Sequence, residues 1–355
     1  MRNYHSFSHS TCGASHKKSD LVCQDASLDN EKDNDERMSI AIVADGHGSP
    51  QYFRSNIGSE KATEVALNGI REFINQNPVE PASFTDGDGE KLLAGLARNI
   101  IATWFSEVEE DEKNHPLKND EKINLIEDKY KNRYLNDPNR QYFYHVYGTT
   151  LIAVAITDNY WFGLHIGDGK CVVLFDDGNW EQPIPWDDKC FLNSTTSICD
   201  DDAISEFRFW YGPTAKGGPK PIAMFIGSDG VDDTYPIHDN EKYLKYLYRS
   251  IVLSFAKEGF ESTSSQIKAL IQKLAEQGSQ DDVSIAGIIK SDVARYVELL
   301  SAQDTADKAK DKAEGDRKKA ELKKQAEQAA QAKAEQQRKR EQETRRNAAL
   351  AEEIE

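Results

Sequence analysis

Cysteine, basic charge and long apolar runs are all in short supply in this chain, and each shortage excludes a class of protein. The five cysteines are odd in number and include no Cys-x-x-Cys pair, which argues against a disulfide framework or a structural zinc site. No apolar run is long enough to cross a bilayer, and the first residues lack the apolar core of a signal peptide. We therefore expect a cytoplasmic protein with no membrane segment.

The deficit of positive charge excludes electrostatic binding to nucleic acid. The chain has 44 Lys and Arg against 61 Asp and Glu, a formal net charge of −17, whereas binding to phosphate backbones needs a basic surface. The last 55 residues are nearly balanced, with 14 basic and 13 acidic residues, so the preceding 300 carry about −18. An acidic charge on these 300 residues is typical of a protein that binds divalent cations, and also of one that uses acidic residues for solubility.

One short apolar run ends abruptly in polar residues and glycines. Ser39–Ala44 is too short for an ordinary helix and predicts a buried strand. It is followed at once by Asp45, Gly46, His47 and Gly48. The glycines allow the backbone to turn sharply and to approach an ion or a phosphate closely. An isolated Asp-Gly-x-Gly is usually an ordinary turn, so its meaning depends on the rest of the chain.

The remaining apolar patterns predict further strands and helices of an antiparallel body. Helical spacing is found from about Pro50 to Pro78, and over Leu92–Val108, Leu244–Phe255 and Ile267–Leu274. Strands are predicted at Gly148–Ile156, Trp161–Ile166, Cys171–Phe175, Ile204–Phe209, Pro221–Gly227 and Val283–Ile289. The first 19 residues are polar, and we interpret their three histidines as scattered surface residues. Residues 109–144 are charged and irregular, which predicts a surface insertion.

The C-terminal residues 293–355 differ from the body in composition. Beyond Leu300 they consist mainly of Ala, Gln, Glu, Lys and Arg, with no aromatic residue. Leu299, Ala306, Ala313 and Ala320 recur every seven residues, a weak coiled-coil seam, and we expect Gly315 to interrupt the helix. The pattern predicts a charged, solvated helical tail, with an oligomerising or partner-binding helix as the alternative.

Acidic residues recur at the ends of the apolar strands. The residues concerned are Asp25, Asp45, Asp168, Asp229 and Asp281. Each alone is explained by an ordinary strand-ending turn. Together in one antiparallel body they suggest a common pocket, where carboxylates repel one another unless they are protonated or neutralised. Hard divalent cations such as Mg²⁺ or Mn²⁺ supply that charge, and two ions sharing an acid would activate a water for phosphoester hydrolysis.

Six motifs in a fixed order carry a resemblance to a known family. They are Cys23-Gln24-Asp25, Ala44-Asp45-Gly46-His47-Gly48, Tyr147-Gly148-Thr149-Thr150, Gly167-Asp168-Gly169, Ser228-Asp229-Gly230 and Gly278-Ser279-Gln280-Asp281-Asp282. Over about residues 10–290 the chain resembles the metal-dependent serine/threonine protein phosphatases of type 2C. The resemblance implies an α+β fold in which two stacked antiparallel β-sheets are flanked by helices. It also implies a catalytic domain over residues 1–292, followed by the tail.

The resemblance implies a role for each acidic residue. Asp45 is expected to bridge two Mn²⁺ or Mg²⁺ ions, and the Gly46 carbonyl to ligate one of them. Asp229 and Asp281 complete the first ion's protein ligands, while Asp25 lies near the second ion. Two further acids, Asp168 and Asp233, match positions that hold a third metal in some members; a structural turn role is the alternative for both.

The resemblance also implies the chemistry of the remaining groups. A water bridging the two ions attacks phosphoserine or phosphothreonine with no covalent phosphoenzyme, and His47 is the general acid for the leaving oxygen. The alternative for His47 is a turn histidine bonded to the backbone. Many members carry an arginine five residues before the Asp25 position, where this chain has Asp20. Arg54 is our replacement candidate for holding the substrate phosphate, the alternative being a surface arginine.

Substrate and partners are less constrained by the sequence. We expect a phosphorylated protein substrate and a partner kinase, with no nucleic acid and no membrane, and the tail as a site of protein–protein contact. Two alternatives stay open. One is a catalytically weak scaffold or metal-binding protein on the phosphatase fold, acting through its tail. The other is a phosphatase for a small phosphorylated metabolite.

Overall fold

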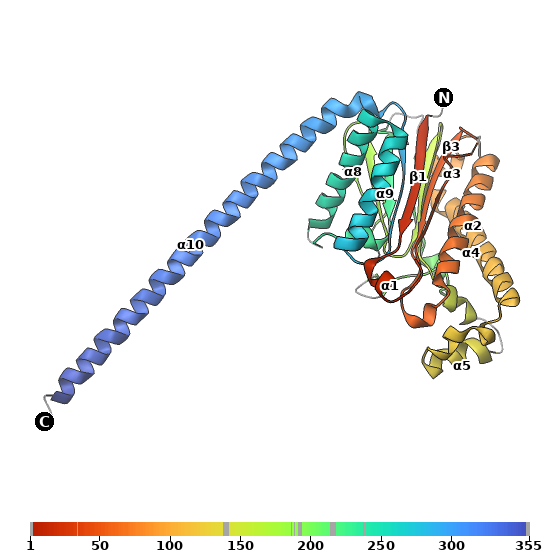
Figure 1. Ribbon diagram of the computed structural model, residues 1–355. Coiled ribbons are helices and arrows are strands. Elements are labelled where there is room, and N and C mark those ends of the chain that lie inside the picture. Colours follow the sequence, from red (N-terminus) through yellow and green to blue (C-terminus); the bar gives the residue numbers. More distant parts are fainter. Residues whose placement is uncertain are drawn as a thin grey trace. The chain divides into compact units, whose positions relative to one another are not determined.

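A computed structural model shows two five-stranded antiparallel sheets stacked face to face, with helices on both outer faces (Figure 1). It describes residues 3–33, 35–137, 142–185, 187, 189–190, 194–213, 218–236 and 239–352, without the side chains of 213 and 348–352. The architecture is the predicted α-β-β-α sandwich. Residues 138–141 of the predicted insertion lie outside the described residues.

Each sheet combines strands that are far apart in the sequence. The first sheet has the order β1-β10-β9-β6-β7 and the second the order β2-β3-β4-β5-β8. The strands of the first sheet are β1 (Tyr4–Thr11), β6 (Lys170–Phe175), β7 (Trp180–Glu181), β9 (Pro221–Gly227) and β10 (Val283–Lys290). Those of the second are β2 (Ala26–Asp29), β3 (Met38–Ala44), β4 (Leu151–Thr157), β5 (Tyr160–Ile166) and β8 (Arg208–Pro213).

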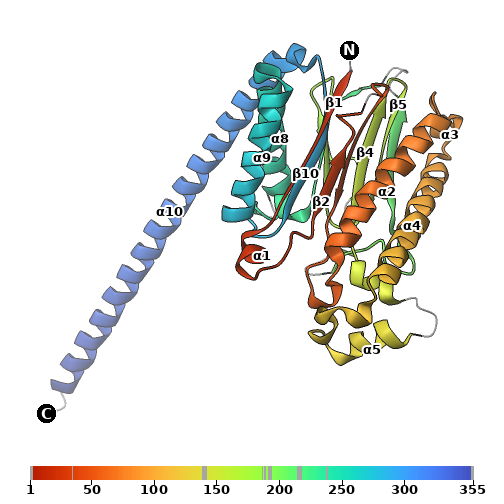
Figure 2. The same cartoon turned by 45° about the vertical axis from the view of Figure 1, so that its right-hand side comes forward.

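Two pairs of long helices cover the sheets. Helices α2 (Ser55–Gln76) and α4 (Gly89–Asn114) lie on the second sheet, as Figure 2 shows, with α2 against β3 and α4 against β8. Helices α8 (Asn240–Glu258) and α9 (Phe260–Gln277) cover the first sheet, where Tyr248 stacks on Phe225 of β9 at 4.5 Å between ring centroids. Shorter helices are α1 (Ala14–Lys18), α3 (Ala82–Asp86), α5 (Asp128–Asn136), α6 (Ala203–Glu206) and α7 (Asp229–Asp232). The predicted strand over Ile204–Phe209 is wrong in its first half, which is α6.

The continuous apolar runs of the central strands have a simple cause. On β3, Ile40 and Ile42 pack toward the helices of the second sheet, whereas Ala41 and Val43 pack against the first sheet. A strand that is buried on both faces has no polar side to show, so it lacks the alternation of a half-exposed strand. This double burial fixes the ends of the central strands, where the acidic motifs begin.

The first strand was missed because its polar face is paired inside the protein. β1 lies at the edge of the first sheet and pairs with β10, from Tyr4 opposite Lys290 to Thr11 opposite Val283. Its serines bond to the β2 region, with Ser8 Oγ donating to Asp29 at 2.6 Å and Ser6 Oγ to Asn30 at 3.2 Å. Hydrogen bonds therefore replace the apolar alternation that marks other strands.

The predicted insertion over residues 109–144 is more ordered and more buried than expected. Its first residues continue α4 to Asn114, and α5 follows after two short 3₁₀ turns. Leu117, Ile123 and Tyr134 are all buried and belong to the same apolar core as α2 and α4. The segment therefore contributes to the core of the body instead of resting on its surface.

The chain divides into two compact units, residues 1–298 and 299–355. The predicted boundary at 292 falls six residues early, because a 3₁₀ turn over Val293–Tyr296 buries Val293 against the body. Among the described residues no helix is both long and apolar enough to traverse a membrane.

The tail is a single helix, α10 (Val297–Glu352). It continues through Gly315, contrary to our prediction, and a side chain there would meet no other atom. Ion pairs one turn apart support it, among them Lys308–Asp304 at 2.6 Å and Lys339–Glu335 at 2.8 Å. Such pairs stabilise an exposed helix by about 0.2–0.5 kcal/mol each.

Candidate metal centre

The acidic motifs meet at one end of the sandwich. Asp25 directly precedes β2, Asp45 directly follows β3, and Asp168 lies in the turn between β5 and β6. Asp229 begins α7 just after β9, and Asp281 lies two residues before β10. Antiparallel neighbours run in opposite directions, so the start of one strand and the end of the next lie at the same end of the sheet.

A cleft of about 450 Å³ opens at this end of the sandwich, and nearly all of the predicted site residues line it. Of the predicted set, those in its wall are Asp25, Asp45, Gly46, His47, Asp168, Asp229, Asp233 and Asp281. Asp282, which we had not singled out, brings the number of aspartates to seven. Among the described residues that line it there is no lysine or arginine. A phosphate anion could enter such a site only if cations first neutralised the wall.

Three of these carboxylates form a tight cluster. One oxygen each from Asp45, Asp168 and Asp229 lies within 4.8 Å of the other two. Burial raises the pKa of Asp45 and Asp229 well above the usual carboxyl range, and the neighbouring carboxylates raise it further. The pKa of Asp168 is raised mainly by burial as well. The donor set is oxygen only, crowded and short of positive charge, which fits hard divalent ions.

Asp25 borders this cluster from the β2 side. Its side chain is buried, and Ser228 Oγ donates a hydrogen bond to its Oδ2 at 2.8 Å. Burial and the charge of Asp282 raise the pKa of Asp25 to about 7. Asp25 thus joins the group of acids that lack a compensating cation.

Two glycines allow the loops to approach each other. A Cβ on Gly46 would lie 2.5 Å from the Gln24 carbonyl oxygen, and one on Gly230 would lie 2.0 Å from the Asp282 carbonyl oxygen. Both contacts are far shorter than packing permits, so a side chain at either position would push a loop away. The glycines therefore keep Asp45 and Asp229 at their places in the cluster.

His47 lies in the cleft wall beside the acids. Its backbone N–H donates to the Gly148 carbonyl at 3.1 Å, and its ring meets Tyr52 edge-on at 4.8 Å between centroids. Burial, reinforced by nearby His145, lowers the pKa of His47 to about 4. The imidazole is therefore neutral at neutral pH.

Asp281 and Asp282 behave differently although they are adjacent. The Asp281 side chain is 59% exposed at the cleft edge and does not join the three-carboxylate cluster. Asp282 is buried, and its carboxylate accepts the backbone N–H groups of Gly13 at 2.7 Å and Gln24 at 2.6 Å. Asp282 therefore ties the N-terminal segment to the start of β10.

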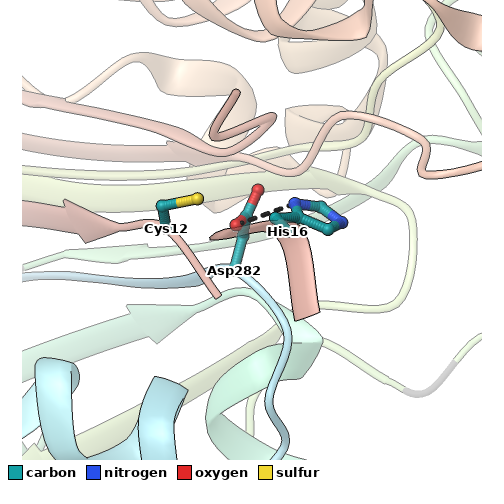
Figure 3. Close-up of side chains that lie close together, drawn as sticks. All are labelled: Cys12, His16 and Asp282. Carbon is teal, nitrogen blue, oxygen red and sulfur yellow. Dashed lines mark ion pairs between the residues drawn. The ribbon is translucent and has the colours of Figure 1, made fainter. Parts of the chain in front are cut away.

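His16, which we interpreted from the sequence as a scattered surface histidine, also lies in the cleft wall. Figure 3 shows its ring beside Asp282, with Nδ1 at 3.0 Å from Oδ1, and its Nε2 is 3.6 Å from Asp281. Its hydrogen bond with Asp282 raises the pKa of His16. No sequence signal separates it from His5 and His9, because its partners lie more than 260 residues away.

Arg54 is placed by the structure outside the cleft. Its side chain is 7% exposed, and its guanidinium contacts Asp120 at 3.1 Å, Asp111 at 3.3 Å and the Tyr147 hydroxyl at 2.7 Å. The guanidinium is thus engaged in a buried polar network, whereas our prediction places it on the substrate phosphate. It is not the surface arginine of the alternative either.

Comparison with known proteins gives one sequence match. The family model described as Protein phosphatase 2C matches residues 12–277. No curated protein matches the chain significantly.

Solved structures show limited likeness. PppA, a key regulatory component of T6SS in Pseudomonas aeruginosa, is 16% identical, with 81% of this chain and 98% of that one covered at a TM-score of 0.47. The catalytic domain of the serine/threonine protein phosphatase PstP, in complex with two manganese ions, is 16% identical, covering 81% and 97% at 0.44. Stp1 from Staphylococcus aureus is 13% identical, covering 81% and 95% at 0.43. With scores below 0.5, the family assignment rests on the sequence match alone.

Proposed function

The chain belongs to the protein phosphatase 2C family of metal-dependent serine/threonine protein phosphatases, and we propose that its acidic cleft is the catalytic centre. The observation that carries this proposal is the wall of seven aspartates with no lysine or arginine among its described residues. Such a wall binds a phosphate only with divalent cations between them. The scaffold alternative is not favoured by the family membership.

We assign the metal-holding role to the acids of the cleft. Asp45, Asp229 and Asp281, with Asp25 and the Gly46 carbonyl, would hold two divalent ions, Mn²⁺ or Mg²⁺. The proximity of Asp168 to Asp45 and Asp229 supports a direct role for Asp168 in the same centre, with Asp233 at its edge. When bound, the ions supply an activated water and neutralise phosphoryl oxygens.

The chain's own groups position the substrate and move protons. His47 faces the cleft with a neutral ring, and a phosphate dianion beside it favours the imidazolium form. The imidazolium then donates its proton to the departing serine or threonine oxygen. The Gln24 amide donates to the His47 carbonyl at 3.1 Å and holds this loop in place.

The substrate is a phosphoprotein, and the finer assignments are also proposals. A partner kinase would supply the phosphoprotein, and both would act in the cytoplasm. Residues 1–298 are the catalytic domain, and α10 serves as a contact helix for another protein, either as a lone charged helix or through its weak heptad seam. The scarcity of large apolar residues in the tail favours the lone helix.

The proposal is tested with the full chain after removal of metals by a chelator. Hydrolysis of a phosphothreonine peptide and of a chromogenic aryl phosphate is measured with Mn²⁺, Mg²⁺ or no metal. Asp45→Asn is compared with Asp88→Asn, the same change at an exposed helix N-cap where Asn serves as well as Asp. We expect metal-dependent hydrolysis in the parent chain and in Asp88→Asn only.

The outcomes separate the alternatives. Small phosphorylated metabolites are assayed alongside, and hydrolysis of the peptide but not of these metabolites rules out the metabolite phosphatase. No metal-dependent hydrolysis of either substrate by the folded parent chain would overturn the catalytic assignment and leave the scaffold.

A further inference from the structure

A second group of metal-ligand side chains lies outside the acidic cluster. It consists of His145, Cys199 and Asp200, and one ligand atom of each lies within 4.8 Å of the others. His145 comes from the 3₁₀ turn over Tyr142–Tyr147, whereas the other two precede α6. The set of nitrogen, sulfur and oxygen donors differs from the all-oxygen cleft, and it matches the ligands of a borderline-soft ion.

We propose that His145, Cys199 and Asp200 form a binding site for a transition metal ion of the zinc class, separate from the Mg²⁺ or Mn²⁺ centre. Three protein ligands leave the fourth tetrahedral position to water. This assignment does not depend on the proposed catalytic function.

The spacing of the donors supports this site. His145 Nδ1 lies 3.7 Å from Cys199 Sγ. Zinc bonds of about 2.3 Å to sulfur and about 2.0–2.1 Å to nitrogen place two tetrahedral ligands roughly 3.6 Å apart. The two atoms are thus already spaced as a shared ion requires, with little rearrangement.

Cys199 is the donor that must give up a proton when a metal ion binds, because the thiolate is the form that ligates metals. On binding, the metal–sulfur bond replaces the S–H bond and the proton leaves to solvent.

Asp200 and the surroundings provide the third ligand and a path of entry. Asp200 Oδ2 accepts the Ser197 N–H at 2.9 Å, which orients the carboxylate and leaves Oδ1 without a hydrogen bond from the described residues. A hollow of about 400 Å³ has Cys199 and Asp200 in its wall, together with Phe105 and Tyr144. An ion can therefore reach Cys199 and Asp200 from outside the acidic cleft.

A competing cluster of the same kind is less suited to bind. Cys12, His16 and Asp282 also lie within 4.8 Å of one another, but both Asp282 oxygens already accept backbone N–H groups. Figure 3 shows His16 directed at that carboxylate rather than at Cys12. A metal there would have to break the bonds that anchor the N-terminal segment.

The site lies against the catalytic wall without being part of it. A Cβ on Gly148 would meet His47 Cδ2 at 2.6 Å, Tyr52 Cδ1 at 3.0 Å and Cys199 Sγ at 3.1 Å. The sulfur and the His47 ring therefore share one glycine as a neighbour, so both are packed around the same backbone position.

The test uses Co²⁺ as a spectroscopic substitute for Zn²⁺. The full chain is stripped of metal, excess Mg²⁺ is added to occupy the oxygen sites, and Co²⁺ is titrated while the absorption spectrum is recorded. We expect one equivalent to bind with a thiolate-to-cobalt charge-transfer band and the intense visible bands of tetrahedral Co²⁺. Zn²⁺ should displace it, since zinc binds such sites more tightly.

Variants identify the ligands. Cys199→Ser should abolish the charge-transfer band, and Asp200→Asn and His145→Gln should each weaken binding by at least about tenfold. Cys190→Ser and Cys12→Ser are matched controls and should keep the band. Circular dichroism verifies folding, and Asp200, which is only partly buried, provides a variant that removes no apolar core contact.

Three results would overturn the site. They are a parent chain with no thiolate band, a band that survives in folded Cys199→Ser, and a band that disappears in Cys12→Ser. A parent chain that shows the thiolate-to-cobalt band but no metal-dependent phosphatase activity would count against the catalytic proposal alone.

Discussion

Two groups of buried charge in the same body show opposite arrangements. In the cleft, Asp45, Asp168 and Asp229 crowd together, and no ion pair with a lysine or arginine links them to other described residues. The Arg54 guanidinium, by contrast, forms ion pairs with Asp111 and Asp120 and donates a hydrogen bond to the Tyr147 hydroxyl. The first group costs stability in the absence of metal, because like charges repel and desolvation disfavours them. The second group holds a cation in direct contact with both of its carboxylates, and it fastens α4 and the following segment to the start of α2.

The difference separates residues kept for chemistry from residues kept for the fold. An uncompensated cluster persists only when the surrounding strands determine it, and it is where a ligand gains most by binding. A compensated cluster needs no ligand. Substitutions in the two groups should therefore affect different measurements.

The largest effect is expected in the cleft. Asp45→Asn should lower kcat by about a thousandfold. The substitution removes a carboxylate that would hold the metal ions, and the lost transition-state stabilisation is about 4 kcal/mol. The measurement is peptide hydrolysis at saturating Mn²⁺. The metal-free variant should be more stable than the parent chain in urea, and a destabilised variant would show that the cluster is not strained.

The next effect is on stability alone. Arg54→Met should lower the free energy of unfolding by about 3 kcal/mol, since it leaves two largely buried carboxylates without their partner. Urea denaturation measures this, and Arg37→Met, which breaks an exposed pair with Asp35, is the control with little change. A large rise in KM for peptide in folded Arg54→Lys would instead restore Arg54 as a phosphate ligand.

Metal and pH should act on the cleft in opposite directions. The raised pKa of Asp25, about 7, means that the folded metal-free chain holds a proton more tightly than the unfolded chain. Stability without metal should therefore fall as the pH rises from about 4 to 7. At a hundredfold excess over Kd, Mn²⁺ should restore about 2.7 kcal/mol at pH 7.5. Thermal melts with and without Mn²⁺ measure both, and equal curves at all pH values would contradict the prediction.

The smallest effect concerns a cleft pair that is already matched. His16→Gln should cost about 1 kcal/mol near pH 6. The folded-state pKa of His16 is raised and that of Asp282 is lowered, so the pair stabilises the fold between about pH 4 and 6.5 and its contribution fades as the pH rises further. Urea unfolding at pH 6 and pH 8.5 should show the larger difference at pH 6.

Much of this organisation could be predicted from the sequence, for identifiable physical reasons. The central strands are buried on both faces, so Ser39–Ala44 and Pro221–Gly227 appear as unbroken apolar runs. The acids follow those runs within one or two residues, so locating the strands also located Asp45 and Asp229.

What could not be predicted depends on partners distant in the chain. Tyr4–Thr11 has no apolar period, because its serines bond to β2. Arg54 finds Asp111 and Asp120 more than 55 residues later, and His16 finds Asp282 at the far end of the body. The Gly315 error has a different cause, since a glycine weakens an exposed helix by only about 1 kcal/mol and neighbouring ion pairs offset that.

The pairing of β1 with β10 has a consequence for folding during synthesis on the ribosome. The first strand has its sheet partner only after residue 290 has been synthesised, and the same late segment supplies Asp281 and Asp282 to the cleft. A chain still attached to the ribosome at residue 270 would contain all five strands of the second sheet, yet it would lack Asp281, Asp282 and β10, so its cleft would be incomplete. Phosphatase activity should thus appear only when residues 1–298 are complete, and a nascent chain should not act on substrates before β10 is in place.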